Sequence, residues 1–208
     1  MIRTDIELSR YDSPFVHYSG DGLLSREDLA VLNAELPDRS VFSREIKSGE
    51  QWRKEYRMWR CEPANEGART AVADRLPRPW SDLVNSVLSR PFREWLSEQT
   101  QVALQSCPLS VGLYIFEDGD FTTIDTGKLE KALTFGLYLN ETWLPEFGGE
   151  FQAFDRKSPD VAPVRETVPV GGRCITFTPT ESSWHRIAGV DTGGRFERLL
   201  MMLEFWRK

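Results

Sequence analysis

Leucines at helical spacing mark the first strongly patterned segment of the chain. Leu29, Leu32 and Leu36 recur three or four residues apart. Ser25 stands before them and is a favoured N-cap residue, whereas Pro37 follows them and cannot continue a helix. The spacing therefore predicts one amphipathic helix in this segment.

A longer helical pattern occupies residues 79–96. One apolar face is formed by Trp80, Leu83, Val84, Val87 and Leu88, and the pattern then restarts with Phe92, Trp95 and Leu96. Pro91 lies between the two groups and removes a backbone donor. We expect a pair of helices, broken or kinked at this proline, whose aromatic side chains face the core.

From about Val102 onward the hydrophobic pattern becomes that of short strands. The β-rich runs are VGLYIFE, LTFGLYLN, GEFQAF, RCITFTP and RLLMMLEFW, and turn-forming glycines, prolines and aspartates separate them. Several short strands at this spacing predict an antiparallel sandwich or barrel. Helices followed by strands indicate a single α+β domain, mainly β, with residues 1–100 as a helical or mixed support region and 101–208 as the β core.

Composition and net charge restrict the range of partners that the chain is expected to bind. The 208 residues are 40% hydrophobic and 28% charged, which is typical of a globular domain, and the net charge is −6. This acidic balance argues against nucleic acid as a partner. One basic, aromatic-rich segment, residues 51–60, would suit an anionic small molecule, although its composition favours an edge strand with Arg and Lys facing water.

The lack of an apolar leader in the first residues and the number of cysteines lead us to expect a cytoplasmic protein. The first fifteen residues lack an apolar run, and no stretch approaches the ~18 apolar residues of a membrane span. Cys61, Cys107 and Cys174 are far apart and odd in number. We therefore expect free thiols in a reducing compartment, with no membrane partner.

The order of motifs in the second half resembles a known family. A Gly-Asp-Phe turn at residues 119–121 is followed by LYLN, GGEF, ITFTP and WHRI. Together these motifs resemble the iron(II)/2-oxoglutarate-dependent dioxygenases, especially the prolyl-hydroxylase-like branch, from about Val102 to Trp206. The resemblance implies a double-stranded β-helix (a jelly roll, cupin-like), N-terminal helices packed on one sheet, and iron(II) and 2-oxoglutarate as cofactors.

The resemblance also implies which residues form the metal site. The family holds iron on two histidines and one carboxylate. Its His-x-Asp pair, placed six residues after Gly119, falls on Asp125 and Gly127, so the expected first histidine is missing. A register shifted by two places Thr123 and Asp125 there instead. The second histidine position matches His185, and iron bound by His185 and Asp125 would be held weakly or not at all.

Three further residues match the cofactor site of the family. Arg198 corresponds to the basic residue that receives the far carboxylate of 2-oxoglutarate, and Arg195 is the alternate. Tyr114 stands where a tyrosine hydroxyl assists this cosubstrate. The resemblance therefore implies a carboxylate-binding site on the last strand.

Three functions remain open from the sequence. The first is an oxygenase of a small molecule in biosynthesis, for which an anionic group is one option, with iron on Asp125 and His185 aided by Glu117, Asp118 or Asp120. The second is an acid–base enzyme that uses Asp125 and His185, because without a metal the pKa of the Asp125 carboxyl should be raised, or its negative charge should draw a proton onto the imidazole. The third is a non-catalytic binding protein on the same fold.

Overall fold

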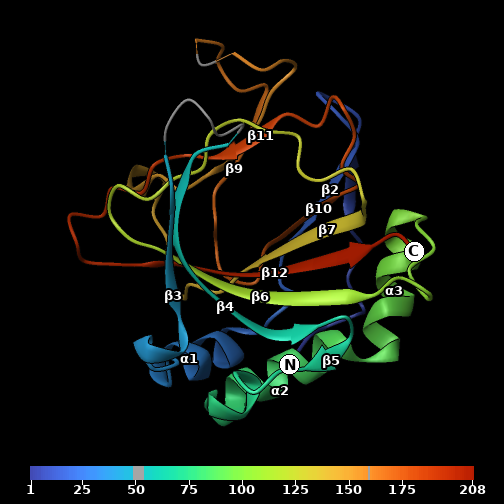
Figure 1. The fold of residues 1–208 in the computed structure, drawn as a ribbon, viewed down its shortest axis with the longest axis vertical. Coiled ribbons are helices and arrows are strands. Elements are labelled where there is room, and N and C mark those ends of the chain that lie inside the picture. Colours follow the sequence, from blue (N-terminus) through green and yellow to red (C-terminus); the bar gives the residue numbers. More distant parts are fainter. Residues whose placement is uncertain (49–53, 159) are drawn as a thin grey trace.

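The computed structural model describes residues 1–48, 54–158 and 160–208 (Figure 1). Two antiparallel sheets face each other, and three helices lie on the outer side of the larger sheet, at the bottom and right of the view. This is the mainly β, α+β jelly-roll arrangement expected from the sequence, with the helices packed on one sheet.

The large sheet has nine strands in the order β1-β2-β10-β7-β12-β6-β4-β3, with β5 paired to β4. Its strands are β1 (Ser9–Tyr11), β2 (His17–Gly20), β3 (Ser43–Lys47), β4 (Tyr56–Asn65), β5 (Ala68–Arg69), β6 (Leu109–Phe116), β7 (Lys131–Tyr138), β10 (Cys174–Phe177) and β12 (Arg198–Trp206). The small sheet has the order β11-β8-β9, built from β8 (Phe151–Ala153), β9 (Arg165–Thr167) and β11 (His185–Ile187).

The helices begin and end close to the predicted residues. They are α1 (Arg26–Ala34), α2 (Arg78–Leu88) and α3 (Arg90–Thr100), with short 3-10 turns at Arg39–Val41, Ala73–Arg75 and Pro145–Phe147. The Ser25 side chain accepts the Asp28 N–H at the start of α1, which confirms the predicted cap. The break between α2 and α3 falls at Ser89, and Pro91 lies in the first turn of α3, where its missing N–H costs nothing.

The two faces of the large sheet have different neighbours. In β12, the odd-numbered residues Leu199, Met201, Leu203 and Phe205 are buried in one cluster with the apolar faces of α2 and α3. The Phe92 ring meets the Phe135 ring edge-on at 5.6 Å between centroids. Because side chains alternate along a strand, the even-numbered residues point to the other face, on which none of the described helices lies.

The first hundred residues contribute more to this sheet than the sequence suggested. Strands β1 to β5 all join it, and β4 pairs with both β6 and β3. The expectation of an edge strand in residues 51–60 was therefore wrong for Tyr56 to Arg60, which lie inside the sheet. Residues 51–53 of that segment lie outside the described residues.

Cysteines and helix lengths agree with the sequence. Cys61, Cys107 and Cys174 are free thiols, and all three are buried. Within the described part of the chain, no helix combines the length and the apolar character required to cross a membrane.

Candidate active site

A cavity of about 1250 Å³ lies between the inner faces of the two sheets. In the large sheet, β6 and β12 line it with even-numbered side chains and β10 with Ile175 and Phe177, and the small sheet lines it with Phe151, His185 and Ile187. Two glycines make room, because Met202 pairs across the sheet with Gly112 on one side and Gly136 on the other. The Tyr114 ring lies over Gly112, where an added Cβ would come within 2.5 Å of its Cε2.

Asp125 and His185 are direct neighbours although sixty residues separate them. The Asp125 N–H donates to the His185 carbonyl at 3.0 Å, and the His185 N–H donates to the Asp125 carbonyl at 2.9 Å. Residues paired in this way across an antiparallel bridge project their side chains to the same side. Both line the cavity, as the sequence led us to expect.

His185 is held as a neutral imidazole. Its Nδ1 lies 2.8 Å from the Ser183 carbonyl, which can only accept, so Nδ1 carries the proton and Nε2 is left as an acceptor. The ring stacks on Phe151 at 5.3 Å and meets Phe177 edge-on at 4.8 Å. Burial lowers the pKa of His185 to about 4, although the Asp125 charge opposes this effect.

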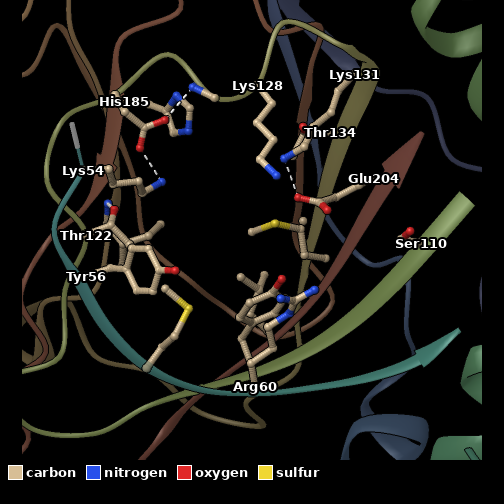
Figure 2. Close-up of a pocket in the computed structure, with 18 of the residues that line it drawn as sticks. Lys54, Tyr56, Arg60, Ser110, Thr122, Lys128, Lys131, Thr134, His185 and Glu204 are labelled. Atoms are coloured by element: carbon tan, nitrogen blue, oxygen red, sulfur yellow. Dashed lines mark hydrogen bonds and ion pairs between the residues drawn. The ribbon is translucent and has the colours of Figure 1, made fainter. Parts of the chain in front are cut away.

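The Asp125 carboxylate is paired with a lysine that the sequence did not single out. One oxygen accepts the Gly127 N–H, and the other forms an ion pair with the Lys54 ammonium (Figure 2). Burial acts to raise the pKa of Asp125, but the Lys54 ammonium and the Gly127 N–H outweigh it and place the pKa below its usual value. The expected rise of this pKa, or proton transfer to His185, was therefore wrong.

Gly127 lies where the favoured register places the acid of the His-x-Asp pair. A Cβ added there would be 3.7 Å from the His185 Cε1, so a carboxylate at this position would reach the imidazole. The glycine has φ +76°, a backbone conformation that other residues rarely adopt. The position beside His185 thus carries no side chain.

The acids expected to assist a metal are engaged elsewhere. Glu117 pairs with Arg39, and Asp120 forms a bidentate pair with Arg44. Asp118 accepts from the Thr192 hydroxyl at 2.7 Å. The hypothesis that these acids help to hold iron was wrong.

The remaining histidine is also outside the cavity. His17 is buried on β2, with its Nδ1 2.8 Å from the Phe15 carbonyl. Among the residues that the structure describes, no group of three or more His, Cys, Asp or Glu side chains could hold a metal ion. The donor set of Asp125 and His185 therefore does not fit the iron(II) facial triad.

Arg198 presents an unsatisfied cation to the cavity. The residue is 0% exposed and begins β12. Its Nε donates to the Gly149 carbonyl at 2.7 Å, whereas both terminal nitrogens lack a partner. Its guanidinium carbon lies 4.9 Å from the Phe116 ring centroid and 5.1 Å from that of Tyr138. Burial lowers the pKa of Arg198, but a guanidinium remains a cation at neutral pH.

This cation matches a ligand carboxylate. A carboxylate binds a guanidinium through two parallel hydrogen bonds, and here two nitrogens are free for them. The Tyr138 hydroxyl is also buried without a partner, so it offers a further donor. Gly149 leaves the space, because a Cβ there would come within 2.8 Å of the Arg198 Cδ. These residues fit the far carboxylate of 2-oxoglutarate.

The other two predicted cofactor residues differ in their placement. Tyr114 lines the cavity, and burial raises the pKa of its hydroxyl, which therefore stays protonated. Arg195 is exposed in the loop before β12, donates to the Thr192 carbonyl at 3.0 Å and does not line the cavity. Arg198 is thus the arginine that the fold brings to the site.

The cavity is positively charged within an acidic protein. Its lining includes nine Lys and Arg side chains against five Asp and Glu side chains, although the net charge of the chain is −6. A cleft of one sign attracts ligands of the opposite sign. The lining therefore favours an anionic ligand.

Sequence analysis missed Lys54 and Tyr138 as site residues. Lys54 lies in the basic segment 51–60 noted above, but its pairing with Asp125 arises only through the fold. Tyr138 could have been found, because the register of β7 and β12 follows from their alternation and pairs Tyr138 with Leu200 on the inner face.

Comparisons with known proteins agree with this architecture. The family model described as the 2OG-Fe(II) oxygenase superfamily matches residues 116–206. No curated protein matches the chain.

Solved structures share the whole fold at low sequence identity. A prolyl-4-hydroxylase from Pseudomonas putida is similar with a TM-score of 0.57 and 16% identity, over 92% of each chain. A 2OG-Fe(II) oxygenase family oxidoreductase from Burkholderia pseudomallei is similar with a TM-score of 0.57 and 13% identity, and the match covers 88% of this chain and 78% of that one. A prolyl 4-hydroxylase from Phytophthora capsici is similar with a TM-score of 0.54 and 19% identity, and the match covers 91% of this chain and 58% of that one. The family model thus covers the β core, and these matches show that the chain has the fold of the prolyl-hydroxylase-like 2OG-Fe(II) oxygenases.

Proposed function

We propose that this protein binds a small dicarboxylate of the 2-oxoglutarate type through Arg198, in an oxygenase-fold pocket that lacks the iron triad. The observation that carries the proposal is a guanidinium that is 0% exposed and has two nitrogens without a partner, beside a cavity. An unpaired buried charge is costly, and an anionic ligand would offset that cost.

The size and charge of the cavity support the same ligand class. Its volume of about 1250 Å³ exceeds the ~300–1,000 Å³ typical of ligand pockets, which leaves room for a second small molecule beside the dicarboxylate. The excess of cationic side chains favours an anionic substrate as well. Oxidation of that substrate is not part of the proposal, because the donor set does not fit iron(II).

Acid–base chemistry is a second candidate, and one contact favours it. His185 is a neutral imidazole with an acceptor at Nε2, and it lies beside the Asp125–Lys54 ion pair. In this scheme His185 takes a proton from carbon next to the carbonyl of a bound oxo acid, and the Lys54 ammonium stabilises the developing oxyanion. Asp125 holds the ammonium in position.

The binding proposal is tested by calorimetric titration of 2-oxoglutarate in the presence of a chelator. We expect saturable binding to the wild type and a loss of at least a hundredfold in Arg198→Met. Arg195→Met is the matched control, because this arginine is exposed and outside the cavity, and its affinity should stay within twofold. Equal affinity in Arg198→Met and the wild type would contradict the proposal.

The acid–base candidate needs a separate measurement. Proton NMR of 2-oxoglutarate in deuterated buffer follows exchange of the protons on the carbon beside its carbonyl. We expect faster exchange with the wild type than with His185→Ala. An equal exchange rate in both proteins would contradict the acid–base candidate without affecting the binding proposal.

A further inference from the structure

A protein cation already occupies the polar end of the cavity. The Lys54 ammonium forms an ion pair with Asp125, and the two side chains are 33% and 16% exposed. The pair is therefore partly shielded from water, although the ammonium remains accessible from the cavity that it lines. Figure 2 shows Lys54 close to His185 on one wall, with a dashed line from its ammonium to the carboxylate.

Asp125 fixes the position of this cation. One carboxylate oxygen accepts the Gly127 N–H, and two backbone hydrogen bonds join Asp125 to His185. The other oxygen is paired with Lys54. The positive charge is thus held beside the one imidazole of the cavity, where the superfamily resemblance places a metal ion.

We propose that Lys54 supplies in this pocket the positive charge that a metal ion supplies elsewhere in the superfamily, and that its ammonium binds the oxo-acid end of the ligand. The inference rests on the proposed function, in which Arg198 binds the other carboxylate. An ammonium has three N–H donors, so its contact with Asp125 leaves two for the ligand. Two protein cations then hold the two ends of one dianion.

The carboxylate at position 125 and the Lys54 ammonium compensate each other in charge. An imidazole at position 125 would give the Lys54 ammonium no negative partner, whereas a carboxylate there neutralises it and directs it. Gly127 removes the second acid of the family pattern, so the ammonium faces one carboxylate and a neutral ring. A divalent ion would have to displace Lys54 to reach Asp125.

Calorimetry with chelated protein tests the role of Lys54 in ligand binding. We expect 2-oxoglutarate to bind the wild type at least tenfold more tightly than Lys54→Met. Lys128→Met is the matched control, because Lys128 also lines the cavity but lies on the other wall in Figure 2, over the Trp206 ring. Its affinity should stay within twofold. Wild-type affinity in Lys54→Met, with Arg198→Met still impaired, would overturn the inference and leave the proposed function intact.

A cobalt(II) titration followed by visible absorption tests the same inference without the ligand. Removing the ammonium frees the Asp125 carboxylate, so Lys54→Met should bind cobalt(II) at least tenfold more tightly than the wild type or Lys128→Met. Equal cobalt affinity in wild type and Lys54→Met would overturn the inference, whether or not 2-oxoglutarate binds. If Lys54→Met does not fold, Lys54→Gln, which keeps a hydrogen-bond donor to Asp125 without the charge, takes its place in both titrations.

Discussion

The two ends of the cavity differ in how far they match the superfamily pattern. At the end proposed to bind a carboxylate, Arg198 and Tyr138 are buried with unpaired donors, and Gly149 leaves space beside Arg198. At the end where the resemblance implies a metal, the favoured register puts Asp125 and Gly127 at the positions of a histidine and an acid, and Lys54 pairs with the carboxylate. The residues thus fit the pattern at the first end and depart from it at the second.

The two ends of the cavity lie on different kinds of backbone, which explains why the end with Asp125 tolerates substitution more readily. Arg198 begins β12, a central strand paired on both sides with β6 and β7. Asp125 and Gly127 lie in the connection between β6 and β7, which carries only isolated bridges in this part. Connections tolerate substitution better than central strands, because fewer packed neighbours constrain them.

The largest expected effect is the pH dependence at the metal end. The unfolded His185 ring takes a proton near pH 6.5, whereas the folded ring does so at about 4. Stability should therefore fall as the pH drops through this window, by up to about 3 kcal/mol. The measurement is urea unfolding from pH 7 to pH 4.

The chain has only two histidines, which makes the control simple. His185→Gln should remove this part of the pH slope, whereas His17→Gln should leave it. Burial also lowers the pKa of His17, so some slope persists in His185→Gln. An unchanged slope in His185→Gln would show that the ring is not desolvated.

The next effect concerns the carboxylate end. Ligand-free Arg198→Met should be more stable than the wild type by about 2 kcal/mol, because a hydrophobic side chain replaces a buried cation with two unpaired nitrogens. Urea unfolding without ligand measures this. With 2-oxoglutarate at a hundred times its Kd, the wild type alone should gain about 3 kcal/mol. A strongly destabilised ligand-free variant would mean that the guanidinium is needed for folding.

A smaller loss of stability is expected from Lys54→Met. The variant leaves the Asp125 carboxylate without its cation, and partial exposure of the pair limits the cost to about 1–2 kcal/mol. Adding Asp125→Asn should restore much of the loss, because the remaining charge is then removed. Additive losses in the double variant would contradict direct pairing.

The smallest effect is that of Gly127→Ala, about 1 kcal/mol. The cost comes from φ +76°, since an added Cβ would make only ordinary contacts of 3.6 Å or more. Gly119→Ala, at φ +77° with no atom within 4 Å, should cost about the same in thermal unfolding. A much larger cost at Gly127 would show that a side chain there collides with the His185 ring.

Hydrophobic spacing predicted the regular elements well where the pattern was strong. The helices around Leu29 and Trp80 and the strands β6, β7, β8, β10 and β12 appear as expected, whereas β9 and β11 match no predicted run. The strands β1, β2 and β3 were not predicted either, because they have only three to five residues with little apolar alternation. Their conformation comes from hydrogen bonds to neighbouring strands, which are distant in sequence.

The sequence by itself predicted the fold class from motif order and strand alternation, which can be read along the chain, and the family resemblance implied a shared site for Asp125 and His185 that lacks the expected first histidine. Only the tertiary structure decided that Arg198 rather than Arg195 reaches the cavity, and that Lys54 meets Asp125. Charge pairing acts through space over a few ångströms, so it joins residues that are far apart in the chain. The strand register that creates this proximity follows from the packing of the whole sheet.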